Sequence, residues 1–246
     1  MKIRVKFTKH GPVRYVGHLD MMRYFQKALR RAGTDVSYSE GYSPHPIMSF
    51  ASPLGVGMES DAEYFDLQVE SSLSSEEEAA RLNRQMADGI QVVSWRLLPE
   101  HAKKAMAQTA AIDYGISLQE GHPLHCEKGE WKKKMEEFLG QEQILVLKKT
   151  KKNEVETDIR SLVFSADASA ADEGGEVFAR LCSESGNSLN VKLFLEAFCN
   201  FCGRPYDMLS YRVCRKEVYY KQEQEDGNSI YLPLEEYGEP IEGDIL

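Results

Sequence analysis

The first segment of the chain alternates apolar and basic residues from Lys2 to Phe7. Because neighbouring side chains of a strand point to opposite faces, this period of two predicts a strand with one buried and one exposed face. Residues 18–32 instead repeat apolar residues every three to four positions, which predicts a helix. Gly33 follows this segment and is a typical helix terminator.

The same two periods predict four further elements before residue 99. They are an apolar run at 47–51 that pairs with the next strand, a strand at 63–69, a helix at 74–87 that opens with a capping box, and a strand at 90–98. The order within residues 1–98 is then β-α-β-β-α-β, which fits a ferredoxin-like split βαβ unit.

The second half of the chain predicts another set of strands and helices. Strands are expected at 110–118, 143–149, 154–159, 175–182 and 211–220, and helices at 130–139 and 190–202. We therefore expect an α+β protein with two ferredoxin-like (βαββαβ) units in tandem, although no sequence repeat relates them. The units would span residues 1–98 and 110–221, with a linker at 99–109 and an acidic tail at 222–246.

Composition places the chain among ordinary globular proteins. Of its 246 residues, 42% are hydrophobic and 28% are charged. No stretch approaches the roughly 20 apolar residues of a membrane helix, and the charged start has no signal-peptide pattern. Five scattered cysteines favour a reduced, cytoplasmic protein without a membrane partner.

The charge is distributed unevenly along the chain. Residues 1–34 contain nine basic residues and one acid, a net charge of +8 in a chain of net −9, so the remainder carries −17. A basic segment of this kind favours an anionic partner such as RNA. A solvated basic face, or one neutralised by the acidic tail, explains the same pattern.

Two loops rich in glycine and proline, residues 11–20 and 39–46, contain the residues most suited to chemistry. The first precedes a predicted helix, where free N–H groups favour an anion such as phosphate. The candidates for acid–base catalysis are His18, His45 and Asp20. The candidates for binding RNA or phosphate are Lys9, Arg14, Arg23, Lys27, Arg30 and Arg31. His18 also fits a packed histidine on the apolar side of its helix, and the prolines around His45 also fit a stiffened loop.

Metal and cofactor sites are not expected. The set His18, Asp20 and His45 and the set His122, His125 and Cys126 contain suitable ligands, but neither follows a known spacing. Cys199 and Cys202 have redox or zinc spacing, but without a second pair they fit buried thiols better. The chain has no phosphate-binding loop, dinucleotide fingerprint, nucleophile elbow or three-cysteine iron–sulfur cluster.

Residues 4–65 resemble the bacterial radical-SAM-associated (radical SAM-linked) family, a domain of unknown function. The stretches that carry the resemblance are Phe7-x-Lys9-x-Gly11, Arg14–Asp20, Arg30–Gly33, Tyr38–Pro46, Ser49–Ala51, Pro53–Gly55 and Glu63-Tyr64. Tyr42 and Ser43 stand where the family pattern usually has Phe and Asn. The resemblance implies an accessory role beside a cobalamin-binding-type radical S-adenosylmethionine (radical SAM) enzyme, and it provides no catalytic residues.

Three functions remain open from the sequence. The first is an accessory protein that binds RNA, such as tRNA or rRNA, through its basic face and presents it to a radical SAM partner. The second is a metal-independent RNA-processing enzyme in which His18 and His45 act as acid and base while Arg14 holds the phosphate. The third is a protein-interaction scaffold. The enzyme hypothesis predicts that His45 lies near His18 and Asp20.

Overall fold

The computed structural model describes residues 1–118, 130–149, 154–169, 176–204 and 206–245. In this part of the chain it is a mixed α+β structure with mainly antiparallel strands and five α-helices. The chain divides into two compact units, unit 1 (residues 1–110 and 217–246) and unit 2 (residues 111–216). The polypeptide therefore enters unit 2 once and returns to unit 1.

The N-terminal part of unit 1 places its elements in the chain order β1-α1-β2-β3-α2-β4. Their bounds are β1 Lys2–Lys9, α1 His18–Ala32, β2 Met48–Phe50, β3 Glu59–Gln68, α2 Ser75–Asn83 and β4 Ile90–Leu97. The short helices η1 (Gly11–Tyr15) and α3 (Ala105–Gln108) precede α1 and follow β4. The strands lie in the order β2-β3-β1-β4, and each neighbouring pair is antiparallel.

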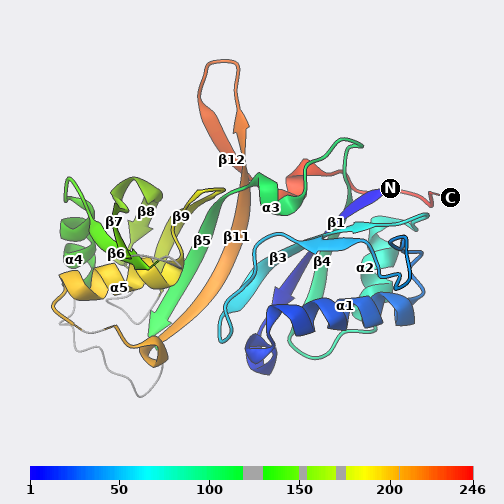
Figure 1. Cartoon of the computed structure of the whole chain (residues 1–246), viewed down its shortest axis with the longest axis horizontal. Coiled ribbons are helices and arrows are strands. Elements are labelled where there is room, and N and C mark those ends of the chain that lie inside the picture. The colour runs from blue at the N-terminus through cyan, green and yellow to red at the C-terminus, as the bar shows by residue number, and fades with distance from the viewer. Residues whose placement is uncertain (119–129, 150–153, 170–175, 205, 246) are drawn as a thin grey trace. The chain divides into compact units, whose positions relative to one another are not determined.

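The core of unit 1 lies between these strands and helices α1 and α2. Phe7 of β1 contacts Phe25 of α1 with ring centroids 4.6 Å apart, and Phe65 of β3 lies 4.9 Å from Phe25. Leu82 of α2 and Trp95 of β4 are also buried in this core. The apolar periods seen in the sequence therefore mark the faces that meet here. Figure 1 shows α1 on the opposite side of the strands from α3.

The second face of β1 is also covered, so the prediction of a half-exposed strand is wrong. Residues 3–7 are all buried, including Arg4 (0% exposed) and Lys6 (8% exposed). The Arg4 side chain donates to Asp66 Oδ1 at 2.8 Å and to the Leu234 carbonyl at 3.1 Å. The C-terminal segment of the chain supplies this cover, and a local sequence pattern does not reveal it.

Helix ends follow the signals in the sequence. Gly33 ends α1 with φ 70°, a left-handed conformation that glycine adopts without strain. Ser74 caps α2, since its hydroxyl oxygen accepts the Glu77 N–H. The helix ends at Asn83, earlier than the predicted residue 87. The Asn83 side chain instead forms two hydrogen bonds with the backbone of Val92, at 2.7 and 2.9 Å, which joins the helix end to β4.

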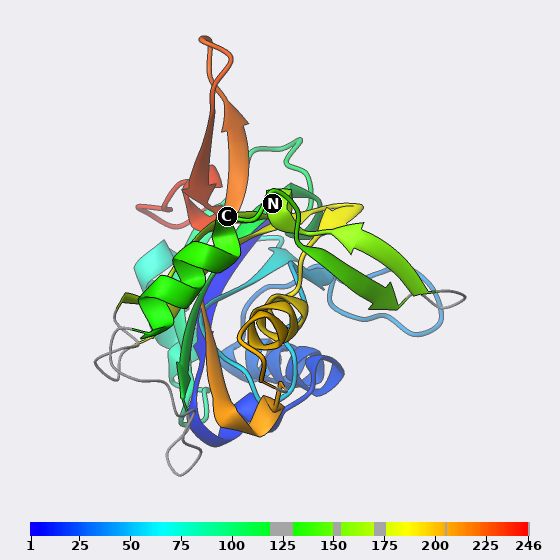
Figure 2. The same cartoon turned by 90° about the vertical axis from the view of Figure 1, so that its left-hand side faces the viewer.

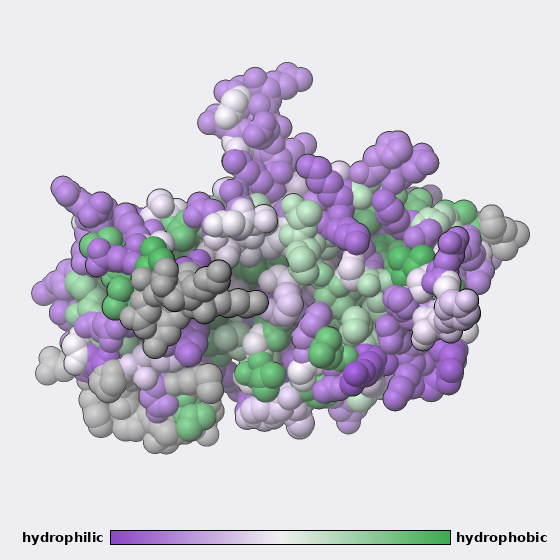
Figure 3. Space-filling model, viewed as in Figure 1, coloured by the Kyte–Doolittle hydropathy of each residue, from purple (hydrophilic) through white to green (hydrophobic). Residues whose placement is uncertain are grey.

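The C-terminal part of unit 1 includes strand β12 (Ser229–Pro233) and the short helix η5 (Leu234–Tyr237). β12 pairs with the end of β11 (Tyr211–Glu223), and Figures 1 and 2 show this hairpin projecting from its unit. The hairpin is largely hydrophilic in Figure 3. Beyond it, Leu234 is 0% exposed and Ile241 belongs to the core of unit 1. The acidic residues of this segment thus accompany buried apolar ones.

Unit 2 contains a second set of antiparallel strands. Its elements are β5 (Thr109–Leu118, which begins in unit 1), α4 (Glu130–Leu139), β6 (Leu145–Lys149), β7 (Glu154–Asp158), β8 (Val163–Asp167), β9 (Val177–Glu184), β10 (Asn187–Ser188), α5 (Val191–Phe201) and the start of β11. Strand β9 pairs with β5, β8 and β10, whereas β6 and β7 form a separate hairpin. The aromatic residues Phe138 and Phe198 join α4 to α5, with ring centroids 5.4 Å apart.

Across the ranges that the structure describes, no helix is long and apolar enough to cross a membrane.

Candidate nucleic-acid interface

The outer side of α1 carries most of the exposed positive charge near the N-terminus. Arg23, Lys27, Arg30 and Arg31 are all exposed on this helix, opposite the buried residues that face the strands. Figure 3 shows hydrophilic side chains with hydrophobic patches among them in the region of α1. We call Arg23, Lys27, Arg30 and Arg31 the basic row.

Few protein groups neutralise the basic row. Arg23 lies 3.4 Å from Asp20, but both side chains are about two-thirds exposed, and such pairs contribute only about 0–1 kcal/mol. Arg31 donates to the Gln85 carbonyl at 3.2 Å. Lys27 and Arg30 have no ion-pair partner in the described residues. The row is therefore a positive surface open to an anionic partner.

Lys9 is not part of this surface, although the sequence suggested that it binds phosphate. It is 3% exposed, and its Nζ donates to the backbone carbonyls of Val16 at 2.8 Å and Arg14 at 3.4 Å. A buried ammonium group needs such partners, because leaving it unpaired is very costly. Lys9 thus holds the loop that contains η1 in place.

Arg14 is held by protein groups as well. Its Nη1 lies 3.4 Å from Glu59 Oε1, and its Nη2 donates to the Tyr15 hydroxyl at 3.0 Å. The hydrogen bond to Tyr15, together with the charge of Glu59, raises the pKa of Arg14. Glu59 itself is 4% exposed and also accepts the Gly11 N–H at 2.9 Å. Arg14 therefore orders the loop in addition to contributing charge.

The three residues predicted for acid–base chemistry do not meet. The His18 ring packs roughly perpendicular to the Phe50 ring, with the ring centroids 5.2 Å apart. Asp20 instead pairs with Arg23 on the exposed side of α1. His45 bonds with Ser39, whose Oγ lies 2.9 Å from His45 Nδ1. In the described chain no hydrogen bond or ion pair joins His18, Asp20 and His45 to one another.

The register of β2 explains why His45 lies away from His18. Phe50, which contacts His18, pairs with Phe65, whereas Pro46 pairs with Tyr38 at the base of a separate loop. Five residue-to-residue steps lead from His45 to Phe50, which corresponds to roughly 16 Å in an extended chain at about 3.3 Å per residue. The expectation that the two histidines share a pocket is therefore wrong, and His18 fits the packed histidine that the sequence also allowed.

A buried network on the covered face of β1 was not predicted from the sequence. Lys6 Nζ lies 2.6 Å from Glu217 and 2.6 Å from Glu235, and Tyr64 donates to Glu217 at 2.6 Å. Only one of its acidic residues comes from a strand that neighbours β1, because Asp66 lies on β3, whereas Glu217 and Glu235 come from the C-terminal segment, which no local pattern reveals. The register pairs Arg4 with Asp66 directly. The network holds two of the basic residues that made the N-terminus appear available to a partner.

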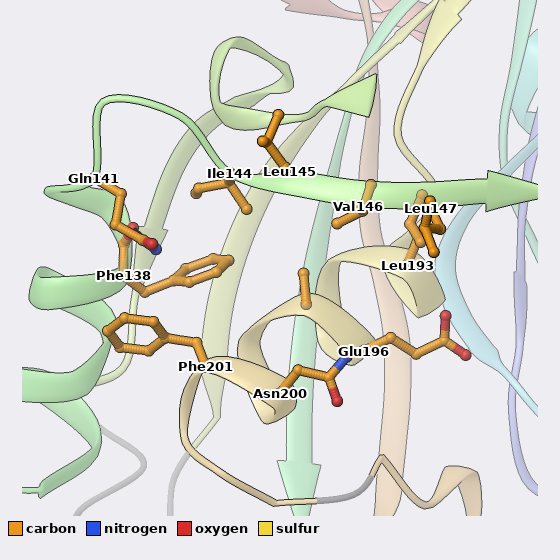
Figure 4. Close-up of a pocket in the computed structure, with 11 residues that line it drawn as sticks. Phe138, Gln141, Ile144, Leu145, Val146, Leu147, Leu193, Glu196, Asn200 and Phe201 are labelled. Carbon is orange, nitrogen blue, oxygen red and sulfur yellow. Dashed lines mark hydrogen bonds between the residues drawn. The ribbon is translucent and has the colours of Figure 1, made fainter. Parts of the chain in front are cut away.

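A hollow of about 470 Å³ lies within unit 2, between α4, β6 and α5. Figure 4 shows Phe138, Phe201 and Ile144 lining it, with Glu196 and Asn200 on the α5 side. A largely apolar hollow of this size suits a small apolar group. None of the residues predicted to form a site lies in it.

Among the residues that the structure describes, Cys199 and Cys202 belong to no group of three or more potential metal ligands. Cys199 is buried, and its Sγ lies 2.9 Å from the Tyr211 hydroxyl. Burial raises the pKa of the Cys199 thiol, which disfavours the thiolate that a metal needs. His122, His125 and Cys126 lie outside the described residues.

One protein family matches most of the chain, including its N-terminal region. No curated protein matched the chain. Residues 2–192 match the model of a family described as "uncharacterized protein conserved in bacteria (DUF2344)", and this description names no partner enzyme. Because the match covers well over half of the sequence, including β1, α1 and both loops around them, the chain belongs to this family.

Proposed function

We propose that this protein binds RNA through the basic row of α1 and acts as an accessory protein to a radical SAM enzyme. The observation that carries the RNA-binding part is the exposure of four basic side chains on one helix in a chain of net charge −9. Lysine and arginine bind phosphates by neutralising them and releasing counterions. The acidic remainder of the chain confines such binding to this surface.

The packing of unit 1 supports α1 as the RNA-binding interface. We infer that residues 1–98 form a ferredoxin-like unit, because their strands have the order β2-β3-β1-β4 with α1 and α2 on one side. Arg4 and Lys6 on the other face of β1 are buried in ion pairs. The exposed positive charge of α1 therefore lies on the helical side of this unit, whereas Arg4 and Lys6 of β1 contribute none.

The separation of His18 from His45 favours binding without catalysis over the RNA-processing enzyme. General acid–base cleavage requires both groups within hydrogen-bond reach of the same phosphodiester. His18 contacts Phe50, and His45 contacts Ser39 in a different loop. The protein then presents RNA to an enzyme and leaves the chemistry to that partner.

The experiment that tests RNA binding uses the triple variant Arg23→Gln/Lys27→Gln/Arg30→Gln. Glutamine has nearly the helix propensity of lysine and arginine, so α1 should persist. Each phosphate contact on a single strand contributes about −0.7 to the slope of log K against log salt. We expect the variant to flatten this slope by roughly two and to weaken binding about equally across sequences. Fluorescence anisotropy with labelled RNA over a salt series measures both.

The matched control is Lys103→Gln/Lys104→Gln/Lys221→Gln, which removes the same charge from exposed positions of unit 1 outside α1. It should reduce the slope much less than the α1 variant. Equal losses in the two variants would mean that net charge alone drives binding. An absence of salt-dependent RNA binding by the wild type would favour the scaffold function, with the basic row docking an acidic protein.

The radical SAM partner is proposed from the resemblance of residues 4–65 to the radical-SAM-associated family. Its test is quantitative affinity purification of the tagged protein from its own cells at low salt. Recovery of a radical SAM enzyme at near-stoichiometric amounts supports the accessory role. Recovery of RNA without any such enzyme would leave RNA binding in place and remove the accessory role.

A further inference from the structure

Tyr15 is an exposed aromatic ring held in a defined position in the loop that leads into α1. It ends η1 and is 61% exposed. The Arg14 guanidinium carbon lies 4.9 Å from the Tyr15 ring centroid, and Arg14 Nη2 donates to its hydroxyl at 3.0 Å. A methyl group at Gly57 would lie 4.0 Å from the ring carbon Cε1, so the backbone of this turn borders the ring as well.

The buried carboxylate of Glu59 holds Arg14, and thereby the loop that contains Tyr15, in place. Glu59 is 4% exposed and accepts hydrogen bonds from the Gly11 N–H at 2.9 Å and from Arg14 Nη1 at 3.4 Å. The Gly57 N–H donates to the Arg14 carbonyl at 2.9 Å. Most exposed side chains lose conformational entropy when they bind a ligand, and a ring held in advance loses less.

We propose that Tyr15 is a stacking platform for an unpaired base, so that the RNA bound along α1 is single-stranded. This inference rests on the proposed function and names its substrate class. A base in a duplex already stacks on its neighbours, whereas an unpaired base gains about 1–3 kcal/mol by stacking on an aromatic side chain. The basic row begins with Arg23 on the helix that follows Tyr15, where it would contact the phosphates of the same strand.

The test compares a short unpaired RNA with the same RNA annealed to its complement, by anisotropy with the full chain. Wild-type protein should bind the unpaired RNA more tightly. Tyr15→Ala should weaken binding of the unpaired RNA by about 5- to 150-fold and leave duplex binding unchanged. The salt slope should stay at its wild-type value because Tyr15 carries no charge. Tyr15→Phe retains the ring and should bind nearly as well as the wild type.

Two further variants separate stacking from structural damage. Tyr42→Ala is the matched control, because Tyr42 is fully exposed and, in the described structure, has no neighbour that holds its ring. It should change the binding of unpaired RNA little. Arg14→Lys keeps the charge but loses the planar guanidinium that lies 4.9 Å from the ring centroid, so it should lower the preference for unpaired RNA at an unchanged salt slope.

The outcomes distinguish this inference from the proposed function. Salt-dependent RNA binding with equal affinities for unpaired and paired RNA, or with full affinity in Tyr15→Ala, would overturn the stacking site and leave the RNA-binding function in place. Equal losses in Tyr15→Ala and Tyr42→Ala would overturn the role of the held ring. Failure of the wild type to bind any RNA would overturn the proposed function itself.

Discussion

Lys6 places its ammonium group between two carboxylates on the covered face of β1. Burial alone would lower the pKa of Lys6, but the hydrogen bonds to Glu217 and Glu235 outweigh burial and raise it. Burial, reinforced by Glu217, raises the pKa of Tyr64 well above its ordinary value, so its hydroxyl stays protonated and donates. The ammonium group of Lys6 is therefore held by two carboxylates, and hydrogen bonds of this kind are what make a buried charge tolerable.

We expect Lys6→Ala to lower the free energy of unfolding of unit 1 by up to about 3 kcal/mol, because it leaves the Glu217 and Glu235 carboxylates, whose side chains are 15% and 20% exposed, without their counter-charge. Lys2→Ala is the control on the same strand, since Lys2 is exposed, and it should change stability by less than about 1 kcal/mol. The two tryptophans lie in different units, so Trp95 fluorescence in a Trp131→Phe background reports unit 1 alone. Similar stabilities for the two lysine variants would contradict this assignment.

The same network predicts a pH dependence. Burial would raise the pKa of Glu235, but the groups around it, foremost the hydrogen bond and the charge of Lys6, together outweigh burial and lower the pKa below the usual 4.5. Its contribution is therefore present above about pH 4.5 and is lost as the pH falls below that value. The raised pKa of Lys6 has the opposite sign, so its contribution is present below about pH 10.5 and is lost above it.

The measurable quantity is the difference in unfolding free energy between wild type and Lys6→Ala over a pH series, since other titrations largely cancel in it. This difference should be largest between about pH 5 and pH 10 and should shrink on both sides. A difference that does not change from pH 3 to pH 7 would mean that Glu235 does not interact with the Lys6 charge.

At the scale of elements, the caps decide where helices begin and end. Ser74 Oγ accepts the Glu77 N–H and donates to the Glu77 carboxylate at 2.6 Å, so the two side chains of the predicted capping box contact each other. Ser74→Ala should lower the free energy of unfolding by about 1 kcal/mol, and Ser74→Asp should restore most of the loss. Urea unfolding followed by circular dichroism measures both. A neutral Ser74→Ala variant would show that packing of Leu82 alone determines the helix start.

At the scale of the whole molecule, the C-terminal segment completes a unit that begins more than 200 residues earlier. Leu234 and Ile241 are buried in unit 1, the Leu234 carbonyl accepts from Arg4, and Glu235 pairs with Lys6. Segments 1–110 and 217–246 must therefore come together before unit 1 is stable. This arrangement makes the acidic end of the chain a structural part of the basic N-terminal unit.

We expect truncation after Tyr231 to destabilise unit 1 by more than about 5 kcal/mol. Burial of each large apolar side chain contributes about 1.5–3 kcal/mol, and the truncation also removes a partner of Lys6. Such a loss approaches the whole stability of a typical domain. The control Glu223→Gln/Glu225→Gln removes two acidic charges from exposed positions of the same segment and should change stability by less than about 1 kcal/mol. Trp95 fluorescence reports the result, and a fully stable truncated chain would contradict it.

The sequence predicted those elements of the fold whose signal lies within a few neighbouring residues, and it missed elements that depend on distant pairing partners. The bounds of α1 and α4 agree with the apolar period and with Gly33, because helix formation depends on neighbours within four residues. Strands β8 and β12 were not predicted, since each is short and acquires its strand character from pairing with β9 or β11.

For the candidate interface, the sequence by itself determined the amphipathic α1 and therefore the exposure of Arg23, Lys27 and Arg30. Only the tertiary structure decided that Lys6 and Lys9 are buried and that His18 and His45 lie apart. The physical reason is that a period of two or of three to four residues reports which side chains share a face. The segments that cover such a face can be far away in the sequence, as Glu235 is from Lys6. Packing of the whole unit determines whether these segments come together, and a local period does not report it.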